Sequence, residues 1–146
     1  MRRRDRIRRA GGSCQELAGL ADRLRELPPK EFLERLALEV AGVRPGWRGT
    51  FDLAVGGRDV IAGRGWRAEY SDGSRGQARH FAGVVAATVR FGPRRTRWVS
   101  VRIRRDAVNS PDGRLTDAAI EFSVGILHGD LPVADAADWI RGRLCA

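Results

Sequence analysis

The sequence has few cysteines and no long apolar run, and each shortage excludes a class of protein. Two of the 146 residues are cysteine, which excludes a disulfide-dense scaffold and the paired cysteine spacings of zinc sites. The longest apolar run, residues 81–89, has about half the length that a helix needs to cross a bilayer. We therefore expect a soluble protein with no membrane partner.

Cys14 and Cys145 lie near opposite ends of the chain. Their separation matches no metal-ligand spacing, so we expect two free thiols of minor structural importance. A bridge that joins the two terminal segments is the alternative if the protein is exported. No apolar signal segment follows the basic start, because residues 10–27 read as a short linker and then an amphipathic helix. A cytoplasmic location is therefore predicted.

The composition is that of an ordinary globular protein, with 42% hydrophobic and 31% charged residues. A chain of this length can bury a core without additional cross-links. We predict a basic, flexible arm over residues 1–10 and a single globular domain over residues 11–146.

Lysine is nearly absent, and arginine is abundant. Lys30 is the single lysine among 27 basic residues, and the formal net charge is +9. The N-terminal arm contains Arg2, Arg3, Arg4, Arg6, Arg8 and Arg9 with one acidic residue. A second cluster, named the arginine block below, contains Arg90, Arg94, Arg95, Arg97, Arg102, Arg104 and Arg105 with no acidic residue. Such clusters attract polyanions, because guanidinium groups pair with phosphates and release counterions.

Trp98 lies in the middle of the arginine block. An indole there could stack on an exposed base while the neighbouring arginines pair with phosphates. The alternative is a solvated basic face that packs against the acidic C-terminal part of the chain. No helix-turn-helix, zinc-finger or ribonucleoprotein signature accompanies the block, so the partner is predicted only as nucleic acid or an acidic protein surface.

Helices are predicted at both ends of the chain. Ser13 followed by Glu16 forms a capping-box pattern before leucines at helical spacing, which predicts a helix over residues 14–27. A second amphipathic helix follows Pro28 and Pro29 and extends to about Val43. Ser110 and Pro111 predict the start of a helix that ends at Gly129, and a short helix closes the chain.

The middle of the chain is harder to assign. Phe51, Leu53 and Val55 alternate as in a strand, and Gly56–Gly57 could turn the chain back, so residues 44–75 are predicted as a short β-hairpin or an ordered loop. Residues 76–91 mix small and apolar side chains and predict a buried helix. Residues 97–104 alternate strictly, which slightly favours a strand over a helix.

These patterns predict a mainly α single domain of four to five packed helices. The helix over residues 76–91 is expected at its centre. The expected core residues are Leu17, Leu20, Leu24, Phe32, Leu36, Phe81, Val85, Phe122 and Ile126.

Four polar residues before and within the central helix are candidates for catalysis. They are Glu69, Asp72, Arg79 and His80. If the preceding loop folds back onto the start of the helix, His80 could act as a general acid or base beside a carboxylate, with Arg79 binding an oxyanion or phosphate. That arrangement suits phosphodiester cleavage. The structural alternative is that Arg79 forms an ion pair with Glu69 or Asp72, and that His80 caps a helix or packs between helices.

The segment Gln77-Ala78-Arg79-His80-Phe81 also carries a resemblance. Together with Glu69 and Asp72 before it and the later helix that contains Glu121 and Phe122, it resembles a pattern in uncharacterised, mostly helical bacterial proteins. The resemblance covers roughly residues 66–130. It implies a helical fold in which residues 69–83 act as a unit, and it implies no activity.

Two function hypotheses follow from these residues. The leading one is a non-enzymatic module that binds an anionic partner through the clustered arginines. The alternative is a small effector-type hydrolase that uses His80. Asp117, Glu121 and His128 share a helical face but form no compact metal motif, so neither a metal nor a cofactor is expected.

Overall fold

The structure is a computed structural model and describes residues 12–102 and 109–146. The basic arm and part of the arginine block lie outside these residues. The α-helices are α2 (Gly12–Arg23), α3 (Pro29–Ala41), α4 (Trp47–Ala54), α5 (Gln77–Phe91), α6 (Pro93–Arg102), α7 (Pro111–His128) and α8 (Ala136–Arg143). Two 3-10 turns, η1 (Ala68–Tyr70) and η2 (Val133–Asp135), connect them. The mainly α prediction is confirmed, with seven α-helices in the described residues where four to five were expected.

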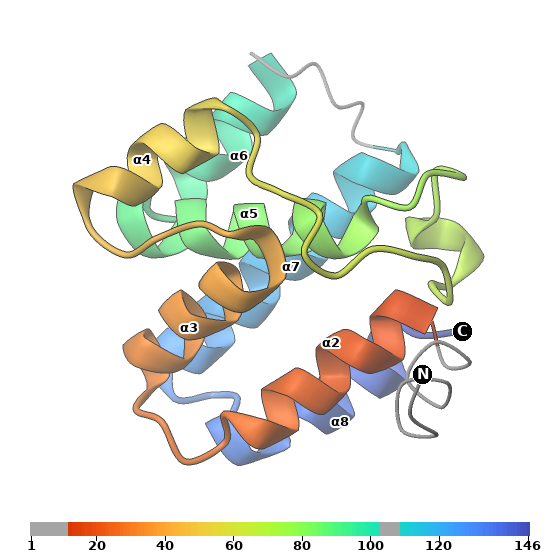
Figure 1. The fold of residues 1–146 in the computed structure, drawn as a ribbon, viewed down its shortest axis with the longest axis horizontal. Coiled ribbons are helices and arrows are strands. Elements are labelled where there is room, and N and C mark those ends of the chain that lie inside the picture. Colours follow the sequence, from red (N-terminus) through yellow and green to blue (C-terminus); the bar gives the residue numbers. More distant parts are fainter. Residues whose placement is uncertain (1–11, 103–108) are drawn as a thin grey trace.

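The two longest helices, α5 and α7, pack against each other at the centre of the molecule (Figure 1). Helix α3 lies against both of them, and α2 pairs with α8 on one side. Helices α4 and α6 lie at the other end, where each contacts α5. The central position of the helix predicted over residues 76–91 is therefore confirmed.

The core is built around phenylalanine rings from three helices. The ring of Phe122 on α7 lies 5.3 Å from that of Phe81 and 6.3 Å from that of Phe32, measured between centroids. Trp66 and Trp139 extend this cluster. Every predicted core residue is buried except Leu24, which is partly buried against the core.

The predicted β-hairpin over residues 44–75 is wrong, because residues 47–54 form α4 and no described residue belongs to a strand. Trp47, Phe51 and Val55 recur every four residues and share one helical face, while Leu53 points to the opposite side, toward the core. In so short an element, the alternation of Phe51, Leu53 and Val55 fits a helix with two apolar faces as well as it fits a strand.

The strand predicted over residues 97–104 is also wrong up to Arg102, since those residues belong to α6. Thr96 and Ser100 are one helical turn apart and are buried, whereas the valines that suggested a strand face are exposed. Residues 103 and 104 lie outside the described part of the chain.

A disulfide joins Cys14 to Cys145, so the prediction of two free thiols is wrong and the alternative bridge is present. The expected capping box is absent as well. Instead, the Ser13 hydroxyl accepts a hydrogen bond from the Trp66 indole at 2.9 Å and lies 3.3 Å from the Arg64 carbonyl oxygen. The start of α2, the C-terminal segment and the loop around Trp66 are thereby tied together.

The start of α7 is confirmed, because the Ser110 hydroxyl accepts a hydrogen bond from the Gly113 amide at 3.1 Å. This cap fixes the first turn of α7 beside α5. None of the described helices combines the length and the apolar character needed to cross a bilayer.

Candidate active site

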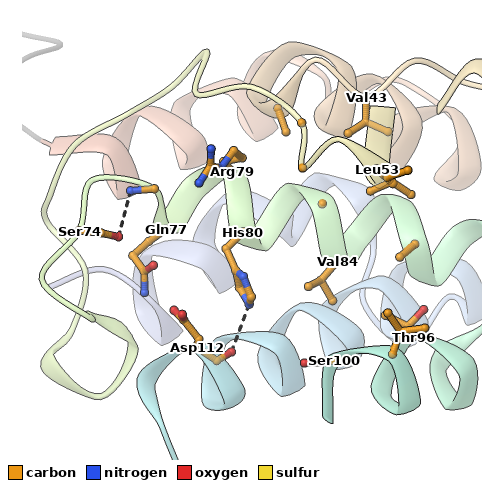
Figure 2. Close-up of a pocket in the computed structure, with 18 of the residues that line it drawn as sticks. Val43, Leu53, Ser74, Gln77, Arg79, His80, Val84, Thr96, Ser100 and Asp112 are labelled. Atoms are coloured by element: carbon orange, nitrogen blue, oxygen red, sulfur yellow. Dashed lines mark hydrogen bonds between the residues drawn. The ribbon is translucent and has the colours of Figure 1, made fainter. Parts of the chain in front are cut away.

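A cavity of about 540 Å³ lies between α4, α5, α6 and the first turn of α7. Its two ends differ in chemistry (Figure 2). One end is polar and contains Asp72, Ser74, Gln77, Arg79, His80, Ser100 and Asp112. The other is largely apolar and contains Val43, Leu53, Ala54, Val84, Ala87, Phe91 and Val99. The cavity therefore suits an amphipathic ligand.

His80 is buried on α5 at the polar end and reaches across to α7. Its Nε2 atom lies 2.8 Å from the Thr116 hydroxyl and 3.2 Å from the main-chain oxygen of Asp112. A carbonyl oxygen only accepts hydrogen bonds, which favours the tautomer with hydrogen on Nε2. In that tautomer Nδ1 is the ring nitrogen that carries no hydrogen.

Two carboxyl groups, those of Asp72 and Asp112, interact beside His80. Partial burial is the largest influence on the pKa of Asp72 and raises it. Hydrogen bonds from Ser74, including one from its amide at 2.8 Å, act together with those from Asp112 and the Asp72 backbone to hold the pKa below the ordinary value. Burial raises the pKa of Asp112; the charge of His80 opposes that shift and the Asp72 carboxylate reinforces it. The pair therefore consists of one carboxylate and one carboxyl group that retains its proton to higher pH.

The raised pKa of Asp112 is unusual for its position. Asp112 lies in the first turn of α7, where the helix dipole ordinarily favours a carboxylate. Its Oδ1 atom is buried and accepts no hydrogen bond from the described residues. Burial thus outweighs the dipole, and a carboxyl group that can hold a proton faces the cavity.

The structure brings together three of the four residues predicted for catalysis. Asp72, Arg79 and His80 line the cavity, whereas Glu69 is exposed on η1 and lies outside the lining. The Arg79 guanidinium forms an ion pair with Asp59 at 3.3 Å. The predicted alternative role of Arg79 in an ion pair is therefore present, although with a different carboxylate.

The sequence analysis missed Asp112, Thr116 and Ser100. These residues come from α6 and α7, and they meet His80 only because α6 and α7 pack beside α5. Thr116 lies one turn after Asp112, so the capped start of α7 was the only sequence signal near them.

Gly83 forms part of the apolar floor of the cavity beneath Leu53. A Cβ atom added at Gly83 would meet only the Cδ2 atom of Leu53, at 3.9 Å. The neighbouring Ala82 has no exposed surface and packs into the core instead. The absence of a side chain at Gly83 thus leaves room in the cavity.

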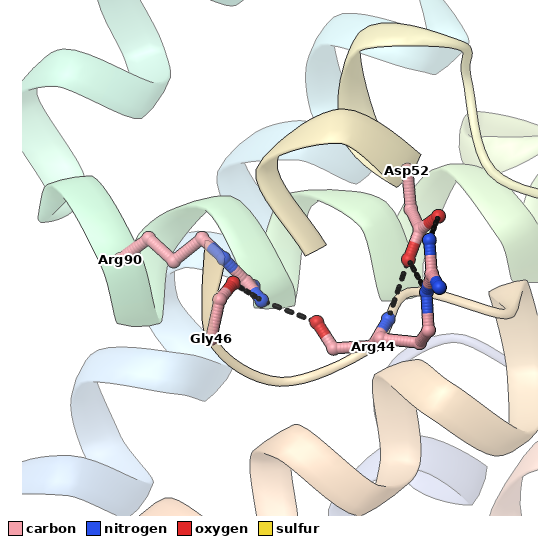
Figure 3. A network of polar contacts seen from close by, with 4 residues as sticks. All are labelled: Arg44, Gly46, Asp52 and Arg90. Atoms are coloured by element: carbon pink, nitrogen blue, oxygen red, sulfur yellow. Dashed lines mark hydrogen bonds and ion pairs between the residues drawn. The ribbon is translucent and has the colours of Figure 1, made fainter. Parts of the chain in front are cut away.

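Helix α4 is held over the cavity by a polar network (Figure 3). The Arg44 side chain donates two hydrogen bonds of 2.9 Å to the Asp52 carboxylate, which lowers the pKa of Asp52 to about 2. Arg90 on α5 donates to the main-chain oxygens of Arg44 and Gly46. A Cβ atom at Gly49 would lie 1.8 Å from the Arg90 guanidinium, so this contact requires glycine.

The arginine block is divided among several roles. Arg90 supports α4, and Arg97 forms an ion pair with Asp117 at 3.1 Å. Arg94, Arg95 and Trp98 are exposed on α6. The side chain of Arg102, together with Arg104, Arg105, Arg2, Arg3 and Arg4, lies outside the described residues.

The acidic residues considered for a metal site are engaged elsewhere. Asp117 pairs with Arg97, and Glu121 pairs with Arg143 at 2.7 Å. Within residues 12–102 and 109–146, no three His, Cys, Asp or Glu side chains lie close enough together to hold a metal ion.

Comparison with known proteins found no matching family model, curated protein or solved structure. The fold and the cavity define a small helical protein, closed by a disulfide, in which acid–base groups meet an apolar pocket.

Proposed function

We propose that the protein is a small hydrolase and that the cavity is its active site. The observation that carries this proposal is the convergence of His80 and the Asp72–Asp112 carboxyl pair at the polar end of a cavity with an apolar other end. A base and an acid that hold their protons at different pH values are what ester hydrolysis requires. The apolar end accommodates a hydrophobic part of the substrate.

In the proposed reaction, His80 accepts a proton from a water molecule whose oxygen attacks the carbon or phosphorus atom of an ester. The bond to the leaving oxygen breaks, and protonated Asp112 donates its proton to that oxygen. The products are an acid and an alcohol. The proton on His80 returns to the Asp112 carboxylate through solvent, which restores the starting state. Thr116 and the main-chain oxygen of Asp112 hold the imidazole in place.

The experiment is a turnover assay with p-nitrophenyl butyrate and bis-p-nitrophenyl phosphate, which separates carboxylic esters from phosphodiesters. His80→Gln should lower kcat by about 10²- to 10⁴-fold, the usual contribution of a general base. Glu69→Gln is the control, because it removes a carboxylate outside the cavity lining. Thermal unfolding of each variant establishes that the fold is retained.

Gly83→Leu gives a second test that spares the acid–base groups. A leucine side chain at this position projects into the apolar end and should exclude substrate, so kcat/KM falls while thermal stability stays near that of the parent. Gly83→Ala is the matched control, because its methyl group makes an ordinary contact with Leu53. Full turnover in both His80→Gln and Gly83→Leu would refute the assignment of the cavity.

A second candidate function is the binding of an anionic partner, nucleic acid or an acidic protein. It is favoured by α6, which has no acidic residue and exposes Arg94, Arg95 and Trp98. Fluorescence anisotropy with single- and double-stranded DNA and RNA at two salt concentrations tests it. Arg94→Gln with Arg95→Gln should weaken binding and flatten its salt dependence.

The disulfide bears on where the protein works. Disulfides persist in oxidising compartments and are rare in the cytosol. The Cys14–Cys145 bridge therefore favours an oxidising compartment over the cytoplasmic location predicted from the sequence.

A further inference from the structure

One face of α5 runs along the cavity from its polar end to its apolar end. His80, Gly83, Ala87 and Phe91 follow one another at intervals of three or four residues, so they share this face, and all four line the cavity. Figure 2 shows the side chains of His80 and Val84 on the same side of the helix. The helical rise places Ala87 about 10 Å along the axis from His80.

Small residues keep this wall of the cavity low. Gly83 and Ala87 are half-buried in the lining, whereas the neighbouring Ala82 and Ala86 are turned into the core and buried. Leu53 of α4 lies above Gly83 and contributes aliphatic surface from the other side. A space that extends along a helix between small and aliphatic side chains suits a linear hydrocarbon chain.

The charges at the polar end favour an uncharged reacting group. Arg79 is the one arginine among the described residues that line the cavity, and its charge is offset by the ion pair with Asp59. The Asp72 carboxyl lines the same end and has a pKa below its ordinary value, so it is ionised at neutral pH. A phosphodiester would bring its own negative charge beside this carboxylate, whereas a carboxylic ester would not.

We propose that the cavity takes uncharged carboxylic esters with a linear acyl chain, that this chain extends along α5 over Gly83 and Ala87, and that Ala87 sets the length of chain accepted. This inference rests on the proposed hydrolase function and names its substrate class. Water adds to the carbonyl carbon beside His80, the bond from that carbon to the ester oxygen breaks, and the products are an aliphatic carboxylic acid and an alcohol. The separation of His80 and Ala87 is close to the length of an extended octanoyl chain.

The test is the dependence of kcat/KM on chain length, measured with p-nitrophenyl acetate, butyrate and octanoate below the concentrations at which these esters aggregate. The parent should use the octanoate at least about tenfold more efficiently than the acetate, because each methylene group that leaves water adds to binding. Ala87→Leu should lower this ratio by about tenfold, since the larger side chain fills the path of the acyl chain. Ala134→Leu is the control, because it adds the same side chain at an exposed position of η2 outside the lining.

Two further variants keep the test independent of the folding of Ala87→Leu. Ala87→Val adds less volume at the same position and should lower the ratio in the same direction. Gly83→Leu lies closer to His80 and should lower kcat/KM for the butyrate as well as for the octanoate. Thermal unfolding of each variant establishes that the fold is retained.

Binding of octanamide, an uncharged analogue of the ester, separates the ligand class from the chemistry when it is measured by titration calorimetry. Equal kcat/KM for the three esters, or a ratio that neither Ala87 variant changes, would overturn the substrate class and leave the hydrolase function standing. Faster turnover of bis-p-nitrophenyl phosphate than of the octanoate, lost in His80→Gln, would do the same. Octanamide binding that Ala87→Leu weakens about tenfold, with no ester hydrolysed by the parent, would support the aliphatic ligand and overturn the hydrolase function. Neither binding nor turnover in the parent would overturn both.

Discussion

Asp112 is subject to two opposing physical effects at a single residue. The start of α7 favours its carboxylate, whereas burial beside the cavity favours its neutral form, and the raised pKa shows that burial is the stronger effect. A group that folding makes less acidic contributes stability that is present at low pH and lost as the pH rises through its folded-state pKa. Ionisation of Asp112 as the pH rises therefore costs the fold stability.

Asp112→Asn should respond to pH differently from the parent. The amide remains neutral at all pH values, so the melting temperature of the variant relative to the parent should be higher at pH 7 than at pH 3. Turnover should fall by about 10²-fold or more, because the amide cannot donate the proton that the leaving group needs. Melting curves and kcat at the two pH values check both parts. A stability difference that is the same at both pH values would contradict the unfavourable ionisation of Asp112.

At the scale of elements, helices with clear boundary residues could be predicted from the sequence. The Pro28–Pro29 pair, Ser110 and Gly129 mark the ends of α3 and α7, and long apolar periodicity identifies both helices. Helices α4 and α6 are short and exposed on one side, so their alternating apolar residues fit a strand as well as a helix. Both segments are helical because they pack on α5, and the segment before α4 is also held by hydrogen bonds from Arg90. These contacts link residues that are far apart in the sequence.

The candidate site could be predicted only in part for the same reason. Asp72, Arg79 and His80 lie within a short stretch of sequence, and a loop that folds back onto a helix start brings them together. Asp112 and Thr116 are contributed by α7, and nothing in the local sequence places them beside His80. The apolar end of the cavity depends on α4, which was expected to be a hairpin or loop.

Helix α4 should be the element most sensitive to a single added methyl group. In Gly49→Ala, the new Cβ atom would lie 1.9 Å from the Arg44 oxygen and would overlap the Arg90 guanidinium. We expect a loss of about 1 to 3 kcal/mol, the usual effect of overpacking, and faster amide exchange confined to α4. Gly142→Ala on α8 is the control, because its Cβ atom would meet no neighbour. Unchanged exchange in α4 of Gly49→Ala would show that the Arg90 network does not hold this helix.

At the scale of the whole molecule, the stabilising cross-link and the candidate site lie at different ends. The Cys14–Cys145 disulfide closes a loop of 131 residues where α2 meets the C-terminal segment, and the Arg67 amide donates to the Leu144 oxygen beside it at 2.9 Å. The cavity is formed by α4, α5, α6 and the start of α7. Loss of the bridge should therefore affect global stability more than the geometry of the site.

The double variant Cys14→Ala, Cys145→Ala tests this separation. A bridge that closes so long a loop restricts the unfolded chain, so its removal should destabilise the protein by about 3 to 5 kcal/mol and lower Tm by ~10 °C. Below its own melting transition the variant should retain the parent's kcat, because α5 and α7 still hold His80 against Thr116. Thermal unfolding, with turnover measured well below both transitions, checks the two parts together. A variant that melts at the same temperature as the parent would show that the bridge contributes little to stability. A lower kcat in the folded variant would show that the terminal segments help to shape the cavity.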